Sequence, residues 1–323
     1  MRAFKMGEKK FIQYITAGLF SNNNVLVKPG ADDAACVKVG NETVVLTTDI
    51  MFLSTHFPVQ MTFEQIGRKI TIANLSDLAA MGSLPISFLA AFGLPSTYEF
   101  RDFKRIISGI NSTCREYNIP FVGGDTKKAK ELTISGIAVG TMQNADILKR
   151  SNSREGDIIA VTGNIGSAAC GMLGLLKNEK VPRKILNAFL HPTARIREGR
   201  IVAESKIKAA GMDITDGLLY SVSEISSASN VRIDIELDKI PVDTYVRKFA
   251  RGHGIPIEQI LNIGEDYELL LSADSKHFEK LQDKIKNAGG NIHPIGNVRK
   301  GKGIYLNKKK INPNGYDAFK TRF

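Results

Sequence analysis

The segment ANLSDLAAMGS, residues 73–83, consists mainly of small and apolar residues and carries one carboxylate, Asp77, near its centre. The residues before it predict a helix that begins after Thr62, because Thr62 and Gln65 have the spacing of a capping box. Gly82 stands where such a helix would end. At about 100° per residue, Asp77 shares a face with apolar residues one and two turns away. The segment therefore predicts a helix with a charge on its buried face, and this charge needs a compensating partner.

Length, composition and charge indicate the class of protein. A chain of 323 residues suggests about two domains, and 43% hydrophobic with 24% charged residues is ordinary for a globular protein. No run of residues is apolar enough to span a bilayer and the N-terminus has no clean secretory signal, so we expect a cytoplasmic protein with no membrane partner. Three separated cysteines indicate neither a disulfide framework nor a zinc site. The net charge of +11 suits a phosphorylated small molecule, whereas no motif indicates nucleic acid.

The first half of the chain predicts a mixed α/β arrangement. Residues 34–39 and 43–49 predict a β-hairpin that turns near Gly40. Pairing about that turn sets Asp33 opposite Thr48, so acidic and hydroxyl groups gather at one end of the hairpin. After the helix that carries Asp77 we expect a strand at 85–95, a helix at 98–118, a short strand at 119–124 that ends at Asp125, and a strand at 131–142.

The second half is again α/β, after a polar segment at 149–157 that we interpret as a domain boundary. The expected strands are 157–163, 211–214, 231–237, 264–273 and 303–307, and the expected helices follow 163, 216 and 276. The glycine-rich stretch GNIGSAACG at 163–171 opens the first of these helices. Such a turn can bind phosphate through its amides, but this one matches neither the GxGxxG pattern nor a Walker loop. Its spacing favours close packing of the helix on a strand.

Aspartates at the ends of apolar segments are the most distinctive feature of the chain. They are Asp33, Asp49, Asp77, Asp125, Asp213 and Asp216. Each of them alone is explained by a helix cap or a turn, and Asp216 in particular could cap a helix that begins at Gly217. Together they fit magnesium, which prefers hard oxygen ligands and bridges carboxylates to phosphates during phosphoryl transfer. The spacing alone leaves the magnesium site and the structural interpretation equally open.

Seven short motifs in a fixed order resemble the thiamine-monophosphate kinases, within the superfamily that includes aminoimidazole ribonucleotide synthetase. They are GADDAA (30–35), TTDIMFLSTHF (47–57), NLSDLAAMGSLP (74–85), VGGDTKK (122–128), GDIIAVTGNIGSAACG (156–171), MDITDGL (212–218) and GEDYELL (264–270). The resemblance extends over almost the whole chain.

This resemblance implies a mixed α/β, two-domain fold of the aminoimidazole ribonucleotide synthetase type. An N-terminal domain, residues 1–150, would bind ATP and magnesium and pair with a second copy to form a homodimer with a shared β-barrel. Residues 151–323 would form a larger α/β C-terminal domain. The implied reaction transfers the γ-phosphoryl group of ATP directly to thiamine monophosphate and gives thiamine diphosphate. It uses several magnesium ions and no phosphoenzyme.

The resemblance also implies roles for particular residues. The implied magnesium ligands are Asp33, Thr47, Thr48, Asp49, Asp77, Asp125, Asp213 and Asp216. The implied ATP contacts are Gly124, Asp125, Arg150 and Thr215, and the implied substrate contacts are His56, Glu265 and Tyr316. Of these residues, Asp49, Asp125 and Asp216 are expected to be catalytic. No general base is needed, because the accepting phosphate oxygen is already anionic at pH 7.

The chain departs from the family pattern at three positions. Ile263 replaces the first glycine of the GGEDYEL motif, Thr215 replaces a serine, and Pro313 stands where an aromatic residue often precedes the C-terminal glycine and tyrosine. Three alternatives differ from this assignment in residues that the sequence shows. A hydrogenase maturation factor would need a C-terminal cysteine, where this chain reads KTRF, and a selenide water dikinase would need a reactive residue well before Cys36. A non-catalytic ATP-binding regulatory protein would be favoured by the loss of acidic positions, and none is lost.

Overall fold

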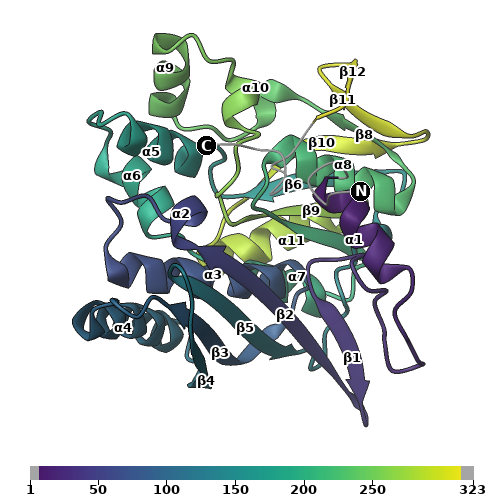
Figure 1. Cartoon of the computed structure of the whole chain (residues 1–323). Helices are drawn as coiled ribbons and strands as arrows, with labels where there is room; N and C mark the ends of the chain where they lie inside the picture. Colours follow the sequence, from purple (N-terminus) through teal and green to yellow (C-terminus); the bar gives the residue numbers. More distant parts are fainter. Residues whose placement is uncertain (1–6, 314–323) are drawn as a thin grey trace.

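Helix α3 (Phe63–Ala80) lies between the two sheets of the fold and contacts both of them (Figure 1). The computed structural model describes residues 7–313. The side chain of Thr62 accepts a hydrogen bond from the backbone of Gln65 and the Gln65 side chain accepts one from Thr62, which completes the predicted capping box. The helix ends before Gly82, whose φ of 74° suits glycine. The prediction of this helix from its end signals is confirmed.

The N-terminal sheet has the strand order β1-β2-β5-β3-β4 and remains open at its two edges. Its strands are β1 (Ala35–Val39), β2 (Glu42–Phe52), β3 (Leu84–Leu94), β4 (Phe121–Lys128) and β5 (Thr133–Thr141), and helices α3 and α4 (Phe100–Glu116) lie on one face (Figure 1). In the β1–β2 hairpin Ala35 pairs with Leu46, which is the predicted register, although Asp33 precedes the ladder. Two boundaries were predicted wrongly. Strand β2 continues past Asp49 to Phe52, where it still pairs with β5, and β4 continues through Asp125, because it pairs with β3 as far as Lys128.

The C-terminal sheet has the order β12-β11-β8-β10-β6-β9-β7. Its strands are β6 (Asp157–Thr162), β7 (Ala209–Ile214), β8 (Arg232–Ile235), β9 (Glu268–Asp274), β10 (Ile292–Arg299), β11 (Gly303–Leu306) and β12 (Lys309–Ile311). The remaining helices are α1 (Glu8–Thr16), α2 (Leu53–His56), α5 (Ser167–Leu176), α6 (Arg183–Leu190), α7 (Ile196–Glu204), α8 (Leu218–Ser229), α9 (Thr244–Gly252), α10 (Ile257–Ile260) and α11 (Ser275–Asn287). Within residues 7–313 there is no helix with the length and apolar character needed to cross a membrane.

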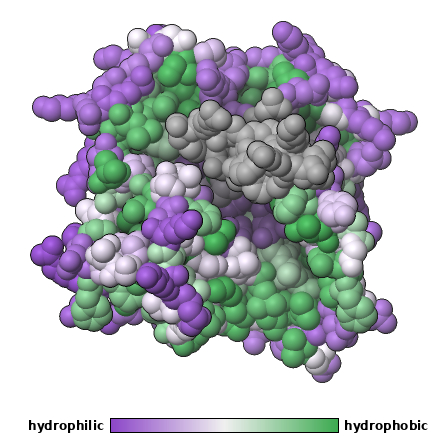
Figure 2. All heavy atoms as spheres, in the orientation of Figure 1, coloured by the Kyte–Doolittle hydropathy of each residue, from purple (hydrophilic) through white to green (hydrophobic). Residues whose placement is uncertain are grey.

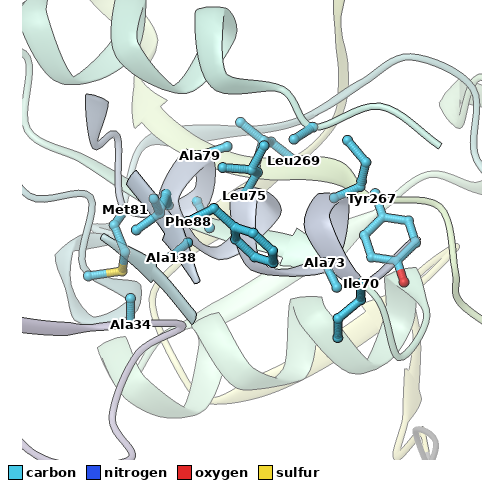
Figure 3. Packing of buried hydrophobic residues seen from close by; sticks show 14 of the residues in the cluster. Ala34, Ile70, Ala73, Leu75, Ala79, Met81, Phe88, Ala138, Tyr267 and Leu269 are labelled. Atoms are coloured by element: carbon cyan, nitrogen blue, oxygen red, sulfur yellow. The ribbon is translucent and has the colours of Figure 1, made fainter. Parts of the chain in front are cut away.

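The largest apolar core joins the two halves of the chain through α3. Figure 3 shows Ile70 and Leu75 of this helix in the same cluster as Tyr267 and Leu269 from the C-terminal half. Close approach at the end of α3 depends on Gly211 of β7, where a Cβ atom would lie 2.3 Å from the carbonyl oxygen of Ala80. Because β7 can approach α3 this closely, residues of both elements can contribute to one site.

Candidate functional site

Three carboxylates from separate parts of the chain meet beside α3. Asp33 comes from the loop before β1, Asp77 from α3 and Asp213 from β7, and one carboxylate oxygen of each lies within 4.8 Å of the others. We call these three residues the acidic cluster. The sequence places them 44 and 136 residues apart. The packing of β7 on α3 brings Asp213 to Asp77, and the loop before β1 adds Asp33.

The acidic cluster carries more negative charge than the described residues compensate. Removal from water raises the pKa of Asp77 well above its ordinary value, and the neighbouring carboxylates raise it further. The pKa of Asp213 is raised by burial and then by the charge of Asp33. One Asp213 oxygen, Oδ2, is buried without a hydrogen-bond partner within residues 7–313. An unpartnered buried oxygen beside other carboxylates is the environment that a bound cation would stabilise.

Strand β2 presents alternate residues to opposite faces of the sheet. Thr47 faces α3, and its hydroxyl donates a hydrogen bond to Asp77. Asp49 faces the same side, where burial, followed by the charge of Asp33, raises its pKa to about 6. Thr48 lies on the other face and donates to the carbonyl oxygen of Gly136 at 2.9 Å. Within one chain, Thr47 and Asp49 therefore lie beside the acidic cluster, whereas the Thr48 side chain lies on the opposite face of the sheet.

Arg150 provides partial compensation of the acidic cluster. Its guanidinium donates to both oxygens of Asp33, at 2.7 Å from Nη2 and 3.3 Å from Nε. Its backbone N–H donates to Asp32 at 2.6 Å, and burial raises the pKa of Asp32 to about 6. The hairpin pairing predicted Asp32 opposite Asp49, but Asp32 was not among the predicted site residues, although its place beside Asp33 in the motif was a usable signal. Arg150 thus lies next to the acidic cluster, where a phosphate group would also meet it.

Asp125 is not brought to the acidic cluster within one chain. It lies on β4, and the strands β5 and β3 separate β4 from β2, a distance of about 14 Å across the sheet. Its side chain is 63% exposed and pairs with Lys127 at 2.9 Å, and this contact lowers its pKa. Gly124 lies beside it, with its backbone close to that of Ala90 on β3.

Thr215 and Asp216 follow β7 and lie next to the loop that carries Glu265. The backbone N–H of Glu265 donates to the carbonyl oxygen of Thr215 at 2.8 Å. The N-cap of α8 is Gly217, with φ 101°, rather than Asp216. The interpretation of Asp216 as a helix cap is therefore wrong, because the chain turns through a glycine conformation before the helix begins.

His56 and Glu265 both contact Lys69, a buried lysine that the sequence did not indicate as a site residue. Lys69 of α3 is 1% exposed, and its ammonium lies 2.8 Å from Glu265 Oε2 and 3.0 Å from the carbonyl oxygen of His56. Burial and then the charge of Lys69 lower the pKa of His56. Nδ1 of His56 accepts the backbone N–H of Phe52 at 3.2 Å, which assigns the proton of the neutral ring to Nε2. The implied substrate residue Tyr316 lies outside the described residues.

Backbone amides of the glycine-rich turn before α5 already bind a carboxylate of the same chain. The backbone N–H of Gly166 donates at 3.0 Å to the carboxylate of Asp266, and that of Ala168 donates to it at 3.4 Å. Burial raises the pKa of Asp266 to about 8, even though these amides favour its charged form. This contact supports the packing interpretation of the turn, because the amides that a phosphate would use are already engaged.

Comparison with known proteins agrees with the motif order. Residues 31–142 match the family model "AIR synthase related protein, N-terminal domain", and residues 154–309 match the corresponding C-terminal domain. The thiamine-monophosphate kinase of Pyrococcus horikoshii is 36% identical over 86% of this chain and 85% of the relative. That of Aquifex aeolicus is 31% identical over 99% of this chain and all of the relative.

A solved structure described as AaThiL complexed with AMPPCP and TMP is similar in three dimensions. It has a TM-score of 0.87 and 29% identity, and the match covers 98% of this chain and 99% of that one. The fold is accordingly the expected two-domain α/β fold of the aminoimidazole ribonucleotide synthetase type. On the identity and coverage of its curated relatives, this chain belongs to the thiamine-monophosphate kinase family.

Proposed function

We propose that this protein transfers the γ-phosphoryl group of ATP to thiamine monophosphate and forms thiamine diphosphate and ADP. The acidic cluster is the observation that carries the proposal. In this reaction a triphosphate approaches a second phosphate, so the site must offset a large negative charge. A group of carboxylates with an unpartnered buried oxygen suits the cations that offset such charge.

The residues that would hold magnesium come first from the acidic cluster, with Thr47 and Asp49 beside it. Their oxygen ligands are of the type that magnesium prefers. When bound, magnesium neutralises phosphate charge and orients the transferring group. We assign Asp216 to the same edge of the site, because it directly follows the end of β7 that carries Asp213.

Residues on the ATP side would bind the triphosphate directly. Arg150 presents a planar guanidinium that can donate two parallel hydrogen bonds to phosphate oxygens. Its present partner, Asp33, belongs to the acidic cluster, so Arg150 would exchange this carboxylate for phosphate once cations bind there. Thr215 would donate through its hydroxyl, since it keeps the hydroxyl of the serine that the family usually has.

Residues on the acceptor side would bind thiamine monophosphate. Neutral His56 would donate from Nε2 to an oxygen of the substrate, because its Nδ1 is already engaged. Glu265 would offer its carboxylate to the positively charged thiamine moiety. The accepting phosphate oxygen is anionic at neutral pH, so these residues orient it and remove no proton.

We also propose that the protein acts as a homodimer through the outward face of the N-terminal sheet. That face carries exposed apolar side chains, among them Ile50 at 54%, Val122 at 54% and Ile86 at 44% exposure, and Figure 2 shows hydrophobic residues over this part of the molecule. A sheet face of this kind is usually covered by a partner. Thr48 and Asp125 lie on the same face by strand register. A second copy packed on this face would therefore bring its own Asp125 toward Thr48.

We place the domain boundary at residues 150 and 151. The first domain would provide most of the metal and ATP contacts, and the second would complete the site with Asp213, Thr215 and Glu265. A cytoplasmic location fits the three buried free cysteines, Cys36, Cys114 and Cys170, since that compartment keeps thiols reduced.

Product analysis tests the proposed reaction. Purified protein incubated with thiamine monophosphate, ATP and magnesium should form thiamine diphosphate and ADP in equal amounts, and omission of the divalent metal should abolish both products. Free thiamine and inorganic phosphate replace the acceptor in matched reactions, and ADP replaces the donor. Phosphorylation of free thiamine at a comparable rate, or ADP formation without thiamine diphosphate, would contradict the assignment. Binding of ATP with no turnover would favour the regulatory alternative.

A further inference from the structure

Lys69 is the most completely buried charge near the acceptor side of the site. It lies on α3 within an apolar segment, and only 1% of its surface is exposed. A buried ammonium is costly unless hydrogen-bond acceptors surround it. Lys69 finds two acceptors, Glu265 Oε2 at 2.8 Å and the carbonyl oxygen of His56 at 3.0 Å, and the ring of Phe189 lies 4.9 Å from its nitrogen.

Both polar partners of Lys69 belong to residues that we assign to substrate binding. His56 ends the short helix α2 in the N-terminal half, and Glu265 lies in the C-terminal half between α10 and β9. One buried side chain therefore fixes two binding residues from opposite halves of the chain relative to each other. An ordinary surface ion pair would not have this effect, because exposed pairs are weak and mobile.

The backbone around Glu265 is already held by other contacts. Glu265 and Tyr267 both have left-handed φ values, 68° and 52°, which non-glycine residues rarely adopt. Hydrogen bonds from their backbone N–H groups to Thr215 and Ile214 maintain this conformation, and Asp266 anchors the loop to the start of α5. The remaining freedom lies in the Glu265 side chain, which is 25% exposed. Its Oε2 contacts the Lys69 ammonium at 2.8 Å and, over a longer distance, accepts from the Tyr267 hydroxyl at 3.4 Å.

We propose that Lys69 is a positioning residue that holds the Glu265 carboxylate and the His56 backbone in the geometry that receives thiamine monophosphate. This inference rests on the proposed function. Lys69 acts through these two residues and does not touch the acidic cluster: Asp77 lies eight residues further along α3, about 12 Å along the helix axis. Loss of the Lys69 charge should therefore weaken the binding of thiamine monophosphate and leave the binding of ATP and metal unchanged.

The test compares Lys69→Met with Lys69→Arg and the wild-type protein. Lys69→Met keeps the apolar length of the side chain and removes the charge. We expect the KM for thiamine monophosphate to rise at least about tenfold, because the partly buried Glu265 carboxylate loses its charged partner. The KM for ATP should stay within about threefold of the wild-type value. Lys69→Arg should restore part of the affinity, since it keeps a charged donor. Lys104→Met on α4 is the matched control, because it removes an exposed lysine charge from the same half.

A double-mutant cycle with Glu265→Gln separates positioning from a general structural role. If Lys69 acts through Glu265, the double variant should be no worse in KM than Glu265→Gln alone. Calorimetric binding of thiamine monophosphate without ATP should show the same pattern independently of turnover. Should Lys69→Met fail to fold, Lys69→Gln, which retains a donor toward His56, replaces it in the cycle.

The outcomes distinguish this inference from the proposed function. Absence of thiamine diphosphate with the wild-type protein would overturn the proposed function itself. An active wild type in which Lys69→Met raises both KM values equally, or in which the effects of Lys69 and Glu265 simply add, would overturn the positioning role alone.

Discussion

Lys69 and Asp77 carry opposite charges on the same helix, and they differ in the partners that the chain provides for them. Lys69 is satisfied within the chain by Glu265 and the backbone of His56. Asp77 receives one hydrogen bond, from Thr47, and faces other carboxylates that raise its pKa. The Lys69 charge is therefore paired within the chain, whereas Asp77 is the charge that our proposal assigns to a bound cation.

The sequence predicted the acidic side of the site and missed the basic side. Carboxylates at the ends of apolar segments indicated Asp33, Asp77 and Asp213 as candidates, because several of them recur in one chain although each alone is explained by a cap or a turn. Lys69 gave a similar signal within the apolar segment IGRKITI, but lysines on helices are usually exposed. Its partner, Glu265, lies 196 residues away, and only the tertiary structure brings them together.

Asp49 makes the stability of the metal-free protein depend on pH. Its pKa of about 6 in the folded state exceeds the ordinary value of about 4, so the folded state binds a proton more readily than the unfolded state. The contribution of Asp49 to the free energy of unfolding is thus fully present below about pH 4 and is lost as the pH rises through about 6. Asp49→Asn removes this loss, which amounts to roughly 1–3 kcal/mol.

The expected result is a difference in melting temperature that grows with pH. In the presence of a chelator, Asp49→Asn should melt higher than wild type by a few degrees at pH 7 and by less at pH 4.5. Asp125→Asn is the matched control, because that carboxylate is exposed and its partner Lys127 lowers its pKa. If the difference in melting temperature between wild type and Asp49→Asn stayed the same across this pH range, the charge crowding that we describe would be ruled out.

At the scale of elements, local signals predicted α3 and tertiary pairing determined β4 and β10. The capping box and Gly82 delimit α3 in the sequence, so its bounds followed directly. Gly123 and Gly124 suggested the end of a strand, yet the parallel ladder with β3 carries β4 past them. Strand β10 contains Pro294 and Gly296 and was not predicted. It forms because β6 and β8 pair with it on both sides, with an irregularity between those two residues.

Elements also determine which residues can form one site. The prediction that the hairpin gathers acidic and hydroxyl groups at one end is consistent with the register of β1 and β2. It did not show which face of β2 lies against α3, and the structure places Thr47 toward α3 and Thr48 outward. Nor could it reveal that Gly211 allows β7 to deliver Asp213 to the same point.

At the scale of the whole molecule, one chain provides an incomplete version of the implied site. Asp125 stays about 14 Å from β2 across an open sheet whose outward face is apolar. A symmetric partner on that face explains both observations together. We therefore attribute the proposed dimer and the position of Asp125 to the same uncovered surface.

Light scattering tests this assembly. The protein should have about twice the chain mass of 35.4 kDa at micromolar concentration. Ile50→Lys places a charge on the outward face of β2 and should give a monomer, since a buried unpaired charge opposes association. Val59→Lys is the control, because Val59 is 95% exposed and lies outside the strands, and this variant should remain dimeric. A wild-type protein that is monomeric and fully active would refute the shared sheet.

Asp77→Asn tests the central claim, which is that cations bound at the acidic cluster make phosphoryl transfer possible. The substitution keeps the size of the side chain and an acceptor for Thr47, and it removes the charge. Without metal, the melting temperature should be unchanged or slightly raised, because crowded negative charge is relieved. Asp283→Asn, on the exposed side of α11, controls for the loss of one surface charge.

The decisive measurement is the stabilisation by magnesium and ATP of wild type and Asp77→Asn, with turnover measured on the same samples. We predict that this stabilisation largely disappears in the variant and that kcat falls at least about a hundredfold, which is the scale of a lost electrostatic contact to the transition state. An Asp77→Asn protein that melts several degrees lower without metal, yet is stabilised by magnesium and ATP and turns over at nearly the normal rate, would show that Asp77 is a structural residue and contradict the account.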